Sequence, residues 1–425
     1  MYRKLLSLLI LHSSFLISVG SVAAQNYYVC DGFNYTAHQI TEGVELPQDW
    51  SDIDSITFEE PQYPEIKIAY NGTTATVSIP SNVKGVSCTS GTSSHVVINS
   101  TTTSEEYLYT LSGNSSDGSF TVNGDYKLSV KLNGVSLTSS KGATVDIECG
   151  KRIDVLVADG TVNTLVDKAK GSHKAAFYTK GHVEFKGGGD LNVTGRTKHA
   201  VSAKEYCIIK ASFTGNLNVL GAVSDGIHCG EGIKGDAENN YFQINGGNVK
   251  ISGCGSDCID SDDYGCAYIN GGKIVMEVSQ EDGNGLKVDS ILQMKAGEIT
   301  ANITGAISNG IRCSYRASFN GGKVTADVKG NGSRGIRGKK TAASSTTTVA
   351  NGGFLDFGGT NVTMTVSGKT NIDDSTTCYG IKADQVLTQT AGDISITVTS
   401  TDSDTKAITA KTDNWTGGTR NGKTK

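Results

Sequence analysis

The chain has 425 residues with 38 Lys and Arg against 43 Asp and Glu, and this net charge of −5 speaks against nucleic acid as a partner. It contains 53 Gly but only 4 Pro. Disordered linkers carry both residues, whereas a solenoid with tight bends and unbroken strand pairing needs glycine and excludes proline. Aromatic residues make up 7% of the chain, so a wide globular core is not expected.

Residues 1–24 are predicted to be a cleaved signal peptide. Arg3 and Lys4 form a basic start, an apolar stretch runs from residue 5 to 19, and Val22-Ala-Ala fits the small-residue cleavage rule. No other segment approaches the roughly 18 apolar residues of a membrane span, so we expect a secreted or cell-surface protein without one. Loss of Arg3 and Lys4 would leave 36 basic and 43 acidic residues, a net charge of −7.

Residues 25–106 are predicted to form an N-terminal leader and a small β cap. Residues 27–30 and 56–58 could each be a strand, and the alternation of apolar and polar residues over 65–98 indicates β-hairpins. A cap of this kind would cover the strand edges that the end of a solenoid otherwise exposes.

Residues 107–410 are predicted to be a parallel β-helix in an all-β protein. Four segments share one frame, with their second glycine position at 247, 272, 297 and 322, an interval of 25 residues repeated three times. A fixed period of this size is typical of a solenoid in which each repeat contacts its neighbours. Apolar residues alternate within a repeat, as in KIVMEV at 273–278, which indicates half-buried strands. Three short strands and three bends account for such a coil.

One apolar position recurs through the coils and sets their predicted register. We call it the marker position, and it is occupied by Val201, Ile227, Ile259, Leu286, Ile311, Ile336, Ile381 and Ile408. Stacked coils lie about 4.8 Å apart, so equivalent positions should lie directly above one another. Two long steps need insertions, which we place at 231–240 and 339–351. Residues 411–425 are predicted to be a frayed polar tail.

The ten cysteines leave two alternatives open. Cys254, Cys258 and Cys266 crowd one bend and could form a disulfide in an exported protein, or they could be free thiols buried in the core. Their spacing is a poor frame for zinc, since His228 is the only imidazole near them in the sequence.

Several segments resemble a known family. SGNSSDGSF at 112–120, LNGVSL at 132–137, ADGTVNTLVD at 158–167 and SDGIH at 224–228 are similar to the secreted β-helix carbohydrate-binding domain family, over roughly 107–410. The resemblance implies a right-handed parallel β-helix shaped like a pectate lyase, with bound calcium, that binds plant cell-wall pectin or cellulose. Asp225 fits the Asp-Gly-Ile motif, but Asn284, Asn309 and Arg334 replace the aspartate in later coils.

Aspartates gather two positions before and three positions after the marker position. Asp225 should stack on Asp257, and Asp262 on Asp289, if the insertion does not shift the register. Two carboxylates at this spacing repel, so one is pushed towards protonation unless a shared Ca²⁺ relieves the repulsion. We therefore expect calcium here, and the alternative is a group of solvated acids. The expected ligands are Asp225, Asp257, Asp260, Asp262 and Asp289, with Asp263 and Asp282 as weaker candidates.

A basic residue follows the marker position in four consecutive coils, at Lys287, Arg312, Arg337 and Lys382. Such a column could hold the carboxylates of a uronic acid polymer, or it could be a solvated face that balances neighbouring acids. Tyr264 and Tyr315 are candidate stacking partners for sugar rings.

Three functional classes remain open. The favoured one is a secreted, monomeric, non-catalytic protein that binds an acidic pectin-type polysaccharide with calcium. The second is a calcium-dependent pectate lyase, for which Lys287 would be the base. The third is a surface adhesin or structural solenoid. A pectin hydrolase is disfavoured because its Asn-Thr-Asp, Gly-His-Gly and Arg-Ile-Lys segments are absent from the sequence.

Overall fold

The computed structural model describes residues 26–31, 34–39, 55–57, 64–168, 174–230, 240–262, 264–340 and 352–425. The predicted signal peptide, Asp263 and most of both predicted insertions lie outside these ranges. The described residues form strands and no helix, which confirms the all-β class. No described helix is therefore long and apolar enough to cross a membrane.

The chain divides into two compact units, Met1–Gln62 and Tyr63–Lys425. The first contains a small antiparallel sheet in the order β2-β1-β3, made of β1 (Asn26–Asp31), β2 (Asn34–Gln39) and β3 (Ser55–Thr57).

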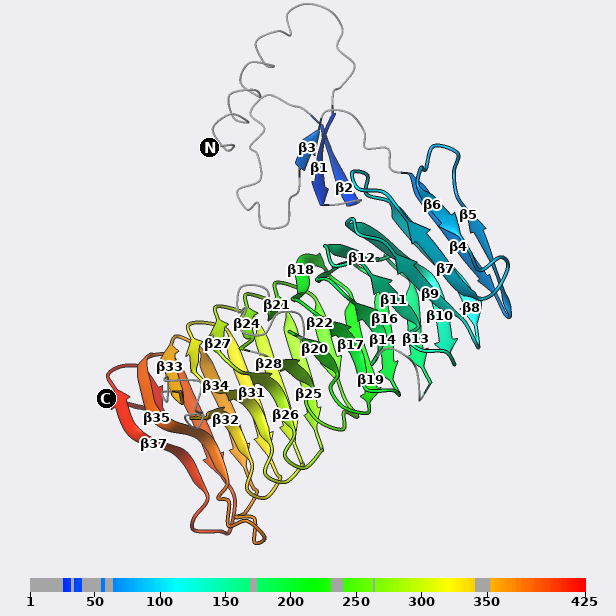
Figure 1. Ribbon diagram of the computed structural model, residues 1–425. Helices are drawn as coiled ribbons and strands as arrows, with labels where there is room; N and C mark the ends of the chain where they lie inside the picture. Colours follow the sequence, from blue (N-terminus) through cyan, green and yellow to red (C-terminus); the bar gives the residue numbers. More distant parts are fainter. Residues whose placement is uncertain are drawn as a thin grey trace, which may run out of the picture. The chain divides into compact units, whose positions relative to one another are not determined.

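The second unit is a solenoid in which strands of successive coils pair in parallel (Figure 1). From β11 to β33 each strand pairs with the third strand after it, or with a part of β35, so each coil contributes three strands. This is the strand arrangement of a parallel β-helix. The strands form three stacks, and each stack collects the strands that lie at one place in successive coils.

The marker stack carries the marker position. It comprises β7 (His95–Ser100), β9 (Ser119–Asn123), β11 (Val145–Glu148), β14 (Ala175–Thr179), β17 (His199–Ala203), β20 (Ile227–Cys229), β23 (Ile259–Ser261), β26 (Asn284–Val288), β29 (Asn309–Cys313), β32 (Arg334–Gly338) and the first parts of β35 (Tyr379–Ala391) and β37 (Lys406–Trp415).

The second stack follows it along each coil. It comprises β8 (Leu108–Ser115), β10 (Leu128–Ser139), β12 (Ile153–Val157), β15 (Val183–Gly187), β18 (Cys207–Phe213), β21 (Tyr241–Ile244), β24 (Cys266–Ile269), β27 (Ile291–Met294), β30 (Arg316–Phe319), β33 (Phe354–Gly358) and the later parts of β35 and β37.

The third stack completes each coil. It comprises the ends of β8 and β10 with β13 (Val162–Asp167), β16 (Asp190–Gly195), β19 (Asn216–Ala222), β22 (Asn248–Ile251), β25 (Lys273–Val278), β28 (Glu298–Ile303), β31 (Lys323–Val328), β34 (Asn361–Val366), β36 (Asp393–Val398) and β38 (Thr419–Arg420). The last strand, β39 (Lys423–Thr424), pairs antiparallel with β38.

The predicted register is confirmed at every step. Val201 pairs with Ile227, and the pairing continues through the marker residues to Ile408. Both long steps, from Ile227 to Ile259 and from Ile336 to Ile381, keep this alignment. The longer spacing at these two steps therefore does not shift the register of the stack.

The two ends of the solenoid differ from the expected boundaries. The predicted hairpins are present, since β4 (Glu65–Asn71) pairs antiparallel with β5 (Thr74–Ser78), and β6 (Val86–Cys88) with β7. However, β4 and β7 also pair in parallel with β8 and β9, so the stacking starts before residue 107. The tail is not frayed, because 412–415 pair with β35 and β38 pairs with β36.

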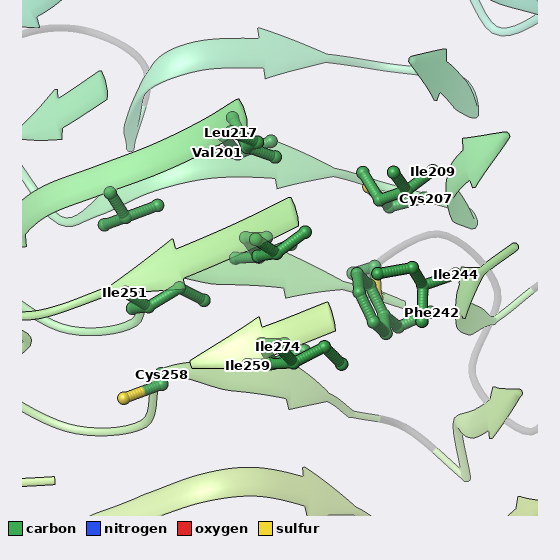
Figure 2. Packing of buried hydrophobic residues seen from close by; sticks show 14 of the residues in the cluster. Val201, Cys207, Ile209, Leu217, Phe242, Ile244, Ile251, Cys258, Ile259 and Ile274 are labelled. Atoms are coloured by element: carbon green, nitrogen blue, oxygen red, sulfur yellow. The ribbon is translucent and has the colours of Figure 1, made fainter. Parts of the chain in front are cut away.

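The core is a column of aliphatic, aromatic and thiol side chains enclosed by the three stacks (Figure 2). Ile259 and Ile274 are fully buried, and the Phe319 and Phe357 rings stack with centroids 4.9 Å apart. All ten cysteines are free thiols, so the buried-thiol alternative holds rather than the disulfide.

Gly330 illustrates how closely the bends between coils approach. A Cβ at Gly330 would lie 1.8 Å from the carbonyl oxygen of Gly305 in the preceding coil. We predict that Gly330→Ala lowers the free energy of unfolding by about 1–3 kcal/mol, because the coils must separate to admit the methyl group. Chemical denaturation measures this. Gly150→Ala is the control, since a Cβ at Gly150 meets nothing within 4 Å. Equal stability of the two variants would contradict the close approach.

Candidate functional site

The polar residues of the marker stack form a ladder two positions before the marker position. The backbone N–H of Asp257 donates to Asp225 Oδ1 at 3.1 Å, so these two residues stack as expected. Asn284 donates to Asp257 Oδ1 from its backbone N at 2.8 Å and from Nδ2 at 2.7 Å. Asn309 Nδ2 donates to Asn284 Oδ1 at 2.9 Å. All four residues are buried, so the ladder replaces the hydrogen bonds that water would make.

The ladder continues into the preceding coil as His199, which our sequence reasoning missed. His199 is buried in β17, and its Nδ1 lies 3.1 Å from Asp225 Oδ2. His228 Nδ1 lies 3.3 Å from the same oxygen, and the two imidazole rings stack with centroids 4.3 Å apart. The signal was present in the sequence, because His199 stands two positions before the marker residue Val201.

The two histidines and burial act oppositely on Asp225. Burial raises the pKa of Asp225, but the close approach of the His199 and His228 imidazoles outweighs it and holds that pKa well below its usual range. Burial lowers the pKa of His199. Asp225 is therefore an ionised carboxylate that lies beside two imidazole rings.

Lys287 is held by the aspartates instead of facing solvent freely. Its Nζ lies 3.1 Å from both carboxylate oxygens of Asp260 and 3.8 Å from Asp257 Oδ2. Burial lowers the pKa of Lys287, but the charges of Asp260 and Asp257 raise it above its ordinary value. Lys287 is thus a protonated partner of the acidic residues, although it pairs in register with Arg312 of the basic column.

Two aspartates are pushed towards protonation. Burial, and then the charge of Asp260, raises the pKa of Asp257 to about 6. Burial, together with the neighbouring Asp262 carboxyl, raises the pKa of Asp289 to about 6. This is the effect expected for carboxylates stacked in adjacent coils.

The oxygens of Asp225, Asp257 and Asp260 all lie within 4.8 Å of one another and could converge on one cation. Asp262 and Asp289 form a separate pair three positions after the marker position. Asp282 belongs to neither group and is exposed in the turn before β26. The structure thus brings together three of the seven expected calcium ligands.

Downstream of Lys287 the marker stack is basic. We call the following five residues the basic cluster: Arg312, Arg334, Arg337, Lys339 and Lys382. Arg312, Arg337 and Lys382 stack in register as expected.

The basic cluster contacts one described carboxylate. Asp384 lies 3.6 Å from Arg337 Nη2 and 4.0 Å from Lys382 Nζ. Arg312 forms no ion pair with any residue that the structure describes, and its Nε is buried without a hydrogen bond there. In the sequence, residues 341–351 contain no Asp or Glu.

Arg334 is the second functional residue that sequence reasoning did not select. It is 3% exposed, and its one hydrogen bond to the described residues runs from Nη1 to the Ile307 carbonyl at 3.4 Å. Burial and the charge of Arg337 lower the pKa of Arg334 to about 10. Burial, Arg312 and Arg337 likewise lower the pKa of Lys339. Positive charge is therefore crowded here beyond what the nearby acids balance.

The two predicted aromatic contacts lie in bends after marker strands. Tyr264 is 46% exposed at a positive φ of 67°, and Tyr315 is 39% exposed. The Tyr315 ring packs edge-on against Phe354 at 6.1 Å. Both rings are partly exposed, and they belong to different coils, since β26 lies between β23 and β29 in the stack.

Comparison with known proteins identifies the family of the chain. The sequence model of a family described as carbohydrate-binding domain-containing protein matches residues 92–421. No curated protein matches the chain. One similar solved structure is a polysaccharide lyase-like protein from C. thermocellum, a gadolinium derivative, at 18% identity and a TM-score of 0.44. The match covers 81% of this chain and 99% of that one, and at this TM-score it supports no conclusion about function.

The raised pKa of Asp289 gives a pH dependence that can be measured. The folded protein holds a proton at pH values where the unfolded chain, with an ordinary pKa of 3.8, has released it. The protonated Asp289 side chain therefore contributes to stability in acid, and this contribution is lost as the pH rises through about 6. In the presence of chelator, Asp289→Asn should melt with the parent near about pH 4 and a few degrees above it near about pH 8.

Glu281→Gln is the matched control, because it removes one acidic charge from an exposed side chain in the same coil. Its melting temperature should follow that of the parent at both pH values. An Asp289→Asn variant that is less stable than the parent in alkali would contradict the burial penalty.

Proposed function

The chain belongs to the carbohydrate-binding domain family, and from this premise we propose that it binds an acidic polysaccharide of the pectin type along its marker stack. The family match at 92–421 contains the whole of the basic cluster and the aspartates above it. The polymer that best suits these charges carries a carboxylate on each sugar.

The observation that carries this proposal is the excess of positive charge in the basic cluster. Removing an ion from water costs several kcal/mol unless a counter-charge compensates it. Arg334 is buried and forms no ion pair with the described residues, and Arg312 is similarly unpaired. A ligand carboxylate would supply the missing counter-charge, and an arginine can hold it through two parallel hydrogen bonds.

The orientation of the polymer follows from the stacking. Arg312, Arg337 and Lys382 succeed one another in neighbouring coils, so their line runs along the solenoid axis. The chain as a whole is acidic, with a net charge of −5, and it repels an acidic polymer at long range. Binding therefore depends on this local positive line, with contributions from Tyr315 at its side.

We also propose that calcium binds at Asp225, Asp257 and Asp260. Carboxylate oxygens are the ligands that Ca²⁺ prefers, and these three groups converge within 4.8 Å. The raised pKa of Asp257 supports the proposal, because a cation would relieve the repulsion that causes it. Lys287 already supplies one unit of positive charge to Asp260, so an ion must share that carboxylate with it.

Binding is favoured over a lyase reaction. A lyase needs a base that can accept the proton next to the uronate carboxylate, and Lys287 was the expected candidate. The charges of Asp260 and Asp257 raise the pKa of Lys287, so it carries its proton and is a poor acceptor. An adhesin or structural solenoid would leave Arg312 and Arg334, which have no ion pair among the described residues, without a role.

Two further expectations belong to the proposal. Export rests on the signal-peptide pattern of 1–24, which lies outside the described residues. Right-handed winding rests on the strong preference of parallel strand connections for that hand.

The basic line is tested by Arg312→Ala with Arg337→Ala. We expect the double variant to bind polygalacturonate at least about tenfold more weakly in an affinity gel, since it loses charge-assisted hydrogen bonds. Added salt should weaken binding of the parent, because exposed charges are screened over about 8–10 Å at physiological ionic strength.

Lys273→Ala with Lys323→Ala makes the same change in net charge on an exposed column of the third stack. This control should bind like the parent. If both double variants bind polygalacturonate as the parent does, the basic cluster is only a solvated face. Ultraviolet absorbance from unsaturated chain ends would instead identify a lyase.

Calcium is tested by thermal unfolding with and without chelator. An ion that binds only the folded protein stabilises it by mass action, so added Ca²⁺ should raise the melting temperature. The increase should be lost in Asp257→Asn, which keeps a hydrogen-bond acceptor for Asn284 while removing a charged ligand. An unchanged melting temperature, with no calcium in a metal assay, would rule the site out.

A further inference from the structure

The upstream end of the acidic residues contains two imidazoles that neither the basic cluster nor a calcium site uses. His199 comes from β17 and His228 from β20, and both contact Asp225 Oδ2. His228 Nδ1 also lies 3.7 Å from Asp260 Oδ2. The four side chains are between 1% and 6% exposed. His199, Asp225 and His228 therefore converge in a site shielded from water, and Asp260 borders it through His228.

The spacing of these atoms suits a small ion. In a tetrahedral zinc site with bonds of about 2.0–2.1 Å, neighbouring ligand atoms lie about 3.3–3.4 Å apart. The contacts here are 3.1 Å, 3.3 Å and 3.7 Å. One ligand atom from each of His199, Asp225 and His228 lies within 4.8 Å of the other two, so these three side chains could share an ion, and Asp260 is the candidate fourth ligand beside His228.

Hydrogen bonding does not explain how the buried imidazole of His199 is stabilised. Within the described part of the chain, neither of its ring nitrogens has a hydrogen bond of acceptable geometry, although Nδ1 is only 3.1 Å from Asp225. A buried polar atom left in this state costs about 1–3 kcal/mol. A metal ion bound at Nδ1 would remove that cost for this nitrogen. Burial lowers the pKa of His199, which favours the neutral ring that a metal requires.

The negative charge of the nearby carboxylates also favours a bound cation. Asp225 and Asp260 are buried beside Asp257, and among the residues that the structure describes Lys287 supplies the ammonium group that contacts Asp257 and Asp260. Neutral imidazoles add no positive charge, so a divalent ion would balance the remaining carboxylates. Calcium takes oxygen ligands, whereas imidazole nitrogen favours zinc, cobalt, nickel or copper.

We propose that His199, Asp225, His228 and Asp260 bind a d-block divalent cation such as Zn²⁺. The site does not depend on the carbohydrate proposal. It shares Asp225 and Asp260 with the proposed calcium site but differs from it in the imidazoles. The chemistry of the ligands therefore separates the two ions.

The experiment uses Co²⁺ as a spectroscopic probe of the full chain after treatment with chelator and desalting. We expect visible d–d bands of the intensity given by four-coordinate cobalt, which saturate at one ion per chain. Zn²⁺ should abolish the bands, whereas Ca²⁺ at the same concentration should not.

The expected bands should disappear in His199→Gln and persist in His182→Gln. The control removes the imidazole of His182, which precedes β15 of the second stack. Its Nδ1 lies 2.7 Å from Glu205 Oε2. Thermal unfolding in chelator checks that each variant is folded, and His228→Gln replaces His199→Gln if the latter does not fold.

Weak bands typical of six-coordinate cobalt, or strong bands that survive both substitutions, would overturn the proposal. Stabilisation by Ca²⁺ without a cobalt spectrum would leave the calcium site in place and exclude this one. A cobalt spectrum that depends on His199, without calcium stabilisation, would support this site and exclude the other.

Discussion

Parallel pairing between coils is the interaction on which the rest of this structure depends. The backbone hydrogen bonds within a stack place each residue above its counterpart in the preceding coil, for example Ile259 above Ile227 and below Leu286. Each side chain therefore lies next to the side chains that occupy the equivalent position in the adjacent coils, as well as next to residues close to it in sequence. Similar apolar residues fill a continuous core, and similar charges are brought to a spacing at which they repel.

The marker stack resolves this repulsion in three different ways along its length. At the upstream end, imidazoles approach Asp225. In the next coils, amide groups of Asn284 and Asn309 and the ammonium of Lys287 compensate the aspartates. At the downstream end, Asp384 compensates only part of the basic cluster. The sign of the uncompensated charge therefore changes along one face of one solenoid.

The register could be predicted from the sequence because it repeats, and repetition is visible without any knowledge of side-chain contacts. The same argument placed Asp225 over Asp257 and Arg312 over Arg337. It could not reveal that the Lys287 side chain turns to Asp260, because that choice depends on rotamers and on burial, which differ between coils with the same backbone. Lys287 and Arg312 occupy equivalent positions, yet within the described ranges Lys287 has an ion pair and Arg312 has none.

His199 and Arg334 were missed for a related reason. Both occupy the position two before the marker residue, where the sequence analysis followed aspartates and treated other residues as departures from the pattern. Any charged or ionisable residue at a buried position of a repeat, whether acidic or basic, should be treated as a candidate site residue. The extent of burial, 3% exposed for Arg334, is a property of the folded stack and not of the local sequence.

The long steps in the solenoid have a practical consequence for engineering. Ile227 and Ile259 are 32 residues apart and Ile336 and Ile381 are 45 apart, compared with 25 for Leu286 and Ile311, yet all three pairs are aligned. The entropy of closing a loop grows slowly with its length, about 0.6 kcal/mol for each doubling. Foreign peptides grafted between residues 230 and 240 or between 340 and 352 should therefore leave the strand register unchanged, at two positions that are four coils apart along the marker stack.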